Sequence, residues 1–175
     1  MKASARVILS TCLALTGADA FAQGKTDYAL NDGQVKFHVP ASWTAIMEKS
    51  DGNPQAVAFQ APDPVAQGSN DSATVTVKTR KLRGSAEFAG VVQDEFERSK
   101  SQPGYESDTS NKDNSVSQYF VQRALTRYLV RDHYYLTGDI AVEIRCTRPL
   151  LDKTPPTWNA EFDRACDSVL ASLKK

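Results

Sequence analysis

The chain has 175 residues, of which 21 are basic and 21 acidic, so its formal net charge at pH 7 is zero. A neutral chain lacks the basic surface that nucleic acids require and the positive charge that holds a protein on anionic membrane. At this length we expect one domain, large enough to bury about two-thirds of its unfolded surface.

The N-terminus has the pattern of a cleavable signal peptide. A short basic region precedes an apolar run over residues 7–16, and small residues follow. The run is too short to cross a hydrocarbon core about 30 Å thick. We therefore predict a signal peptide over residues 1–22, cleaved after Ala22 rather than Ala20, and a single domain over residues 23–175. The mature chain is expected to be periplasmic, without a transmembrane anchor.

The cysteines support an exported, soluble protein. Cys12 lies inside the predicted signal peptide, where Thr11 fits a lipid-attachment box badly. Only Cys146 and Cys166 then remain in the mature chain. An even pair in an oxidising compartment is typical of a disulfide, with two buried thiols as the alternative. The pair lacks the Cys-x-x-Cys spacing of a dithiol redox site.

The first half of the mature chain is predicted to be strands followed by one helix. Asn31-Asp32-Gly33 is a turn signal between two short alternating segments, which indicates a hairpin. Strands are predicted at residues 28–30, 35–39, 44–48, 56–60 and 73–79, and a loop at 61–71. A helix is expected from Ser85 to near Lys100, with one stripe formed by Phe88, Val91, Val92, Glu95 and Phe96.

The second half begins with a polar segment over residues 101–117, which we expect to be an exposed loop. Strands are predicted at residues 118–122, 126–130, 133–136 and 140–146. In the last strand Ile140, Val142, Ile144 and Cys146 share one face, so Cys146 is expected to point into the core.

The C-terminal segment is predicted to be a helix that begins after Thr154. Its apolar stripe consists of Trp158, Phe162, Cys166, Val169, Leu170 and Leu173. Cys146 and Cys166 can therefore join strand and helix, and a bridge that closes a loop of about twenty residues stabilises by about 3 kcal/mol. The element order predicts an α+β domain, a mostly antiparallel central sheet with helices packed on it.

Known catalytic and metal-binding patterns do not match this sequence. His38 and His133 have no histidine or cysteine neighbours at metal-ligand spacing, and we expect His38 to face solvent from its strand. Asp132 and His133 are adjacent on a strand and face opposite sides, so they cannot form the pair of a catalytic triad. We expect no catalytic residue, no cofactor and no metal site.

Two groups of side chains are possible binding features. Tyrosines at 119, 128, 134 and 135 either present rings on a sheet face or fill the interface between sheet and helix. Arginines at 123, 127, 131, 145 and 148 have few acidic neighbours in sequence, and a mixed, solvated face is the simpler explanation. Trp43 is expected to anchor the preceding turn to the core.

Three segments together resemble the PsbP-like and DcrB-like domains. These are the strand-Pro-small-small-Trp stretch at residues 35–43, the hairpin at 134–142 and the closing helix ending at 169–173. The resemblance spans most of the mature chain and implies an α/β/α sandwich around an antiparallel sheet. Members of that family are mostly non-enzymatic adaptors without shared catalytic residues, and the cysteine pair lies outside the family's general pattern.

The expected function is a periplasmic, non-enzymatic protein that binds another protein, as an adaptor or as an immunity protein against a toxin. The alternative is a carrier of a small molecule or lipid, with a pocket between sheet and helix. An enzyme whose site is assembled from dispersed polar groups is the third possibility.

Overall fold

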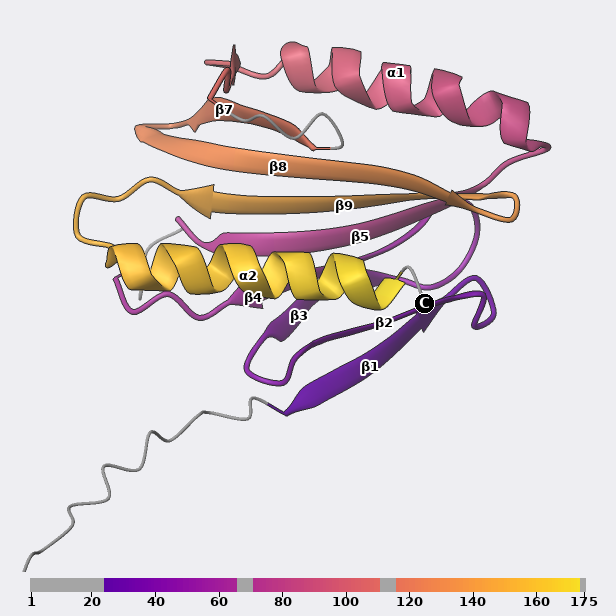
Figure 1. Ribbon diagram of the computed structural model, residues 1–175, viewed down its shortest axis with the longest axis horizontal. Helices are drawn as coiled ribbons and strands as arrows, with labels where there is room; N and C mark the ends of the chain where they lie inside the picture. The colour runs from indigo at the N-terminus through magenta and orange to yellow at the C-terminus, as the bar shows by residue number, and fades with distance from the viewer. Residues whose placement is uncertain (1–23, 66–70, 111–115, 174–175) are drawn as a thin grey trace, which may run out of the picture.

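Seven antiparallel strands form the central sheet, in the order β3-β4-β5-β9-β8-β7-β6 (Figure 1). The computed structural model describes residues 24–65, 71–110 and 116–173, so the predicted signal peptide lies outside the described residues. The strand bounds are β3 Thr44–Lys49, β4 Gln55–Ala61, β5 Ala73–Lys81, β6 Glu106–Ser107, β7 Ser117–Arg123, β8 Thr126–Thr137 and β9 Ile140–Pro149.

Two helices and a separate hairpin pack on this sheet. The hairpin consists of β1 (Lys25–Leu30) and β2 (Val35–Pro40), and the helices are α1 (Phe88–Lys100) and α2 (Pro156–Leu173). A short 3-10 turn over Ser85–Glu87 leads into α1. This arrangement confirms the predicted α+β class. Within the described residues, neither helix has the length and apolarity needed to cross a bilayer.

One face of the sheet carries the main core. Side chains alternate between the two faces along each strand, so the apolar positions of β4, β5 and β9 all face α2 and the hairpin. Phe162, Cys166 and Val169 of α2 are buried among them, and Phe37 and Val39 of β2 complete the same cluster. Figure 1 shows α2 lying along the strands with the hairpin beside it. The predicted stripe of the C-terminal helix is therefore correct.

The two predicted cysteines are joined by a disulfide within this core. Cys146 of β9 and Cys166 of α2 are both buried, and their Cα atoms lie 6.4 Å apart. The strand alternation and the helix stripe each turn a cysteine inward. The bridge consequently ties α2 to the centre of the sheet.

The other face of the sheet carries α1, the helix predicted from Ser85 to near Lys100. The expected apolar stripe, including Phe88 and Phe96, is half-buried, and the fully buried residues of α1 are Glu95 and Ser99. The strand positions that face α1 are polar on β5 and β9, because they alternate with the apolar positions that face α2. The helix therefore presents the polar Glu95 and Ser99 to this surface beside the apolar Phe88 and Val91.

The strands after residue 117 also differ from the prediction. Residues 126–137 form one long strand, β8, where two shorter strands were predicted. Arg131 and Asp132 interrupt the apolar pattern, but each has an ion-pair partner, so the strand continues through them. The expected loop contains the short strand β6, which pairs with β7.

The turn between β7 and β8 holds an unfavourable backbone conformation. Ala124 has a φ of 50°, a region that normally favours glycine or asparagine, and the neighbouring Leu125 is 98% exposed. The side chain at position 124 therefore costs folding energy at this turn.

We expect Ala124→Gly to stabilise the protein by about 0.5–1 kcal/mol, since glycine adopts this φ without steric cost. Denaturant unfolding of the two proteins measures the difference. Ala29→Gly in the exposed strand β1 is the matched control and should lower stability. A loss of stability for Ala124→Gly would contradict the assigned conformation.

Protein recovered from the periplasm should contain no free thiol at Cys146 or Cys166. Reduction should lower its free energy of unfolding by about 3 kcal/mol, because the denatured chain loses a closed loop of about twenty residues. Mass analysis after alkylation without reductant tests the first point, and denaturant titration with and without reductant tests the second. Two alkylated cysteines in native material would disprove the bridge.

Candidate functional site

Both histidines lie in strands, at separate places. His38 of β2 is half-buried, and its Nδ1 lies 3.2 Å from an Asp27 carboxylate oxygen. It faces away from the core, as predicted, while Phe37 and Val39 are buried. His133 of β8 is buried on the α2 side of the sheet, near the sulfur of Cys166. That sulfur is held in the disulfide and is not a thiolate ligand, so this group does not make a metal site.

A polar network lies on the opposite face, beneath α1. Asp132 is only 1% exposed and accepts two hydrogen bonds from Arg145, each of 2.8 Å. The hydroxyls of Tyr119 and Tyr134 donate to the same carboxylate, at 2.9 and 3.2 Å. Ser99 of α1 lies 3.0 Å from the Tyr119 hydroxyl. As predicted, Asp132 and His133 face opposite sides of the sheet.

A second group of charges continues the network along α1. Lys78 of β5 contacts Glu95 at 2.6 Å and Glu143 at 3.3 Å, and Arg145 lies 3.1 Å from Glu143. Arg98 also pairs with Glu95, at 2.8 Å. Every one of these charges has a partner of opposite sign, so the network can be buried without leaving an unpaired charge.

Burial and charge shift the pKa values in this network. Burial raises the pKa of Glu143, and the attraction of Arg145 and Lys78 only partly offsets it. Burial also opposes ionisation of Glu95, but the hydrogen bond and charge of Lys78 outweigh it and lower the Glu95 pKa. Burial and the Asp132 charge raise the pKa of Tyr119, which keeps this phenol neutral. The space between α1 and the sheet is about 10 Å³, enough for one water at most.

Four of the five arginines that we expected on a mixed, solvated face are paired with acidic groups. Arg131 and Arg148 contact Asp167 and Asp163 of α2. Arg127 pairs with Glu106, Arg145 with Asp132, and Arg123 lies over the Tyr128 ring. Tyr119 is buried beneath α1, where it contacts Ser99, and Tyr128 is buried in a small cluster with Tyr119, Val121 and Val130, so neither presents an open ring.

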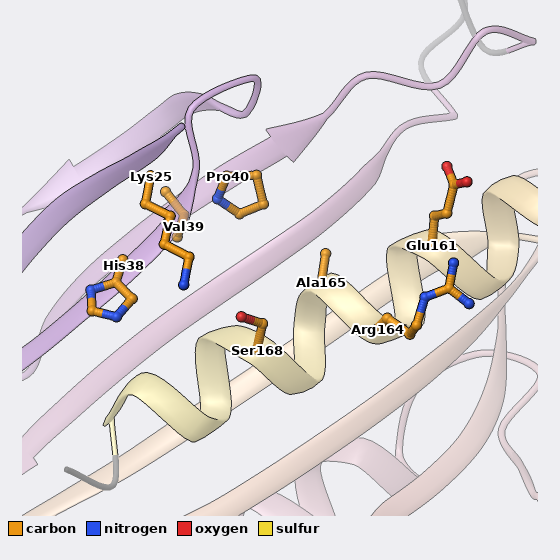
Figure 2. Close-up of a pocket in the computed structure, with 8 residues that line it drawn as sticks. All are labelled: Lys25, His38, Val39, Pro40, Glu161, Arg164, Ala165 and Ser168. Atoms are coloured by element: carbon orange, nitrogen blue, oxygen red, sulfur yellow. The ribbon is translucent and has the colours of Figure 1, made fainter. Parts of the chain in front are cut away.

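An opening lies between α2 and the β1–β2 hairpin. It has a volume of about 460 Å³, and Figure 2 shows its eight lining residues. The hairpin supplies Lys25, His38, Val39 and Pro40, and the helix supplies Glu161, Arg164, Ala165 and Ser168. We call this opening the hairpin–helix cleft.

The hairpin–helix cleft carries two permanent cations. The acidic groups near it are already engaged, since Asp27 contacts His38 and the aspartates of α2 pair with arginines of the sheet. Among the described residues, no carboxylate lies within 4 Å of the Lys25 or Arg164 nitrogens. Glu161 is the one acid in the lining. Among the described residues that line it, the cleft therefore offers an anionic group two unpaired cations, beside one unpaired carboxylate, Glu161.

A smaller hollow of about 80 Å³ continues the cleft toward the start of α2. Both openings share Glu161 and Ala165, and the smaller one is also lined by Trp43, Trp158 and Phe162. Trp43 is half-buried against Phe162, with ring centroids 6.1 Å apart. Trp43 therefore anchors its turn, as expected.

The sequence did not reveal this site. Its two walls lie more than 100 residues apart in the chain, and neither wall contains a recognisable motif. The one local signal was the stretch at residues 35–43, which ends in Trp43 and supplies part of both openings.

No protein-family model and no curated protein matches the chain. Solved structures with a similar fold include LpqN of Mycobacterium tuberculosis, involved in cell envelope biogenesis, with 16% identity and a TM-score of 0.50 over 83% of this chain and 87% of LpqN. A Bacteroides thetaiotaomicron protein has 17% identity and a TM-score of 0.52 over 86% of this chain, which spans 47% of that protein. The Pseudomonas aeruginosa protein PA94, of unknown function, has 18% identity and a TM-score of 0.49, over 85% and 95% of the two chains.

Similarity at these identities shows a shared fold alone. None of the three structures carries the name of the PsbP-like or DcrB-like domains, so that resemblance stays a prediction from the sequence pattern.

The buried network predicts different losses of stability for two isosteric variants. Asp132→Asn should cost about 3 kcal/mol, because it removes the paired acceptor of a largely buried arginine. Glu143→Gln should cost much less at pH 7. The raised pKa of Glu143 means that its ionisation opposes folding, so wild type loses stability relative to Glu143→Gln as the pH rises from about 4 to 7.

Denaturant unfolding across this pH range measures both effects. A Glu143→Gln variant that lowers the free energy of unfolding at pH 7 as much as Asp132→Asn does would contradict the network described above. So would a difference between Glu143→Gln and wild type that does not change with pH.

Proposed function

We propose that this protein is an exported, non-enzymatic binding protein whose hairpin–helix cleft receives an acidic segment of a partner protein. The observation that carries the proposal is the pair of unpaired cations, Lys25 and Arg164, on opposite walls of the cleft. Opposite charges across an interface steer association and fix register.

Export is supported by two independent features. Residues 1–22 have the composition of a signal peptide, and the mature chain contains a buried disulfide between its two remaining cysteines. Disulfides persist in oxidising compartments such as the periplasm and are rare in the cytosol.

The polar network supports a binding role over an enzymatic one. Its acid, arginine and tyrosines satisfy one another beneath α1, where the remaining space holds one water at most. Raised tyrosine pKa values keep the phenols of Tyr119 and Tyr134 protonated, so they act as hydrogen-bond donors and not as bases. The network therefore fixes α1 to the sheet.

A small anionic ligand is the second candidate occupant of the cleft. Its volume of about 460 Å³ lies within the range of about 300–1,000 Å³ that is common for small-molecule sites. The expected carrier pocket between sheet and helix finds less support, because the space under α1 is about 10 Å³ and α2 is packed tightly against the sheet.

Placing a photo-crosslinking amino acid at Ser168, an exposed position in the cleft, tests the protein-binding proposal. We expect a discrete crosslinked product in cells that export the protein, identified as one partner by mass spectrometry. Arg164→Gln in the same chain should reduce its yield several-fold, because the acidic segment loses one of its two cations. The control is the same crosslinker at Lys49, an exposed strand residue outside the cleft lining.

Lys49→Gln should leave the Ser168 product unchanged and serves as the matched charge control. Equal products from both crosslinker positions, or a yield that does not respond to Arg164→Gln, would overturn the protein-binding proposal. An anionic small molecule retained in native mass spectra of wild type and lost from Arg164→Gln would support the second candidate in its place.

A further inference from the structure

The hairpin–helix cleft and the smaller hollow lined by Trp43, Trp158 and Phe162, which we call the aromatic hollow, adjoin along α2, and we refer to the two together as the groove. Glu161 and Ala165 line both openings, so a bound segment can reach from one into the other. Toward the C-terminal end of α2 the groove is cationic, and toward the N-terminal end it is aromatic. The turn from Pro40 to Trp43 borders both parts.

The aromatic part is held in a fixed arrangement. Phe162 stacks against Trp158, with ring centroids 5.6 Å apart, and against Trp43, with ring centroids 6.1 Å apart. The Trp158 ring nitrogen donates a hydrogen bond to the Pro62 carbonyl at 2.9 Å, which fixes the orientation of the indole. Rigid aromatic walls of this kind bind planar or large apolar groups at low entropic cost.

We infer that the groove recognises a short extended segment in which an acidic side chain lies two or three residues from an aromatic side chain. This inference rests on the proposed function and adds the second recognition element of the partner. The acidic group pairs with Lys25 and Arg164, and the aromatic group packs on Trp43 and Trp158.

The spacing follows from the geometry of the helix. Trp158 and Arg164 are six positions apart on α2, which corresponds to about 9 Å along the helix axis. An extended chain advances about 3.3 Å per residue, so two or three residues cover this distance. A single acidic residue without an aromatic neighbour would occupy only the cationic part.

Glu161 sets the charge at the junction of the two parts. Its carboxylate disfavours a second acidic residue in the middle of the segment and can accept a backbone N–H from the bound chain. Glu161→Gln should therefore strengthen binding of a segment with two adjacent acidic residues, while it changes binding of a single-acid segment much less.

Tryptophan emission reports directly on this groove, because Trp43 and Trp158 are the only two tryptophans of the chain and both line it. The probes are the peptides acetyl-Asp-Ala-Phe-amide and acetyl-Asp-Ala-Ala-Phe-amide, each compared with versions in which Asp is replaced by Asn or Phe by Ala. Titration calorimetry measures affinity in parallel with fluorescence.

At least one Asp/Phe peptide should bind and change the emission, with affinity at least fivefold above its Asn version. The Phe→Ala version should bind more weakly through the cations, without changing the emission. Arg164→Gln should weaken both acidic peptides, and Lys49→Gln should weaken neither.

The two proposals fail in different ways. Equal affinity with and without Phe, still sensitive to Arg164→Gln, would overturn the inference about the aromatic element and leave the acidic-segment proposal standing. Affinity that depends on neither Asp nor Arg164 would overturn both.

Discussion

Phe162, Cys166 and Val169 of α2 are almost completely buried against the sheet and the hairpin, and this packing positions the other features of the molecule. It brings the helix sulfur to β9, where the disulfide forms. It also holds α2 beside β2, where the His38 amide donates a hydrogen bond to the Ser172 hydroxyl. The hairpin–helix cleft is the space between these two walls.

The two faces of the sheet are stabilised by different forces. The α2 face buries aliphatic and aromatic side chains, which gains free energy in proportion to the apolar area removed from water. The α1 face buries ions that are matched one against another, an arrangement that contributes little net stability but penalises any wrong pairing. We regard α2 and the hairpin as the source of stability and the charged network as the feature that fixes where α1 sits.

Sequence periodicity predicted the part of the fold that follows from apolar burial. The alternation ending at Cys146 and the stripe through Cys166 correctly predicted which sides of β9 and α2 are buried, because hydrophobic burial determines both patterns. The same rule did not reveal that Glu95 of α1 is buried by contact with Lys78, a residue seventeen positions away that no local pattern reveals. It failed for the cleft for the same reason, since Lys25 and Arg164 come to line one opening only after the hairpin and helix have packed.

The bridge between β9 and α2 spans the connection at residues 150–155, which includes half-exposed and exposed positions at one end of the molecule. A protease that cuts there breaks the backbone between β9 and α2. The disulfide still joins the two segments, because Cys146 precedes the cut and Cys166 follows it. The severed helix keeps its attachment to the sheet and one wall of the cleft stays in place. A molecule nicked in this way would keep the hairpin–helix cleft.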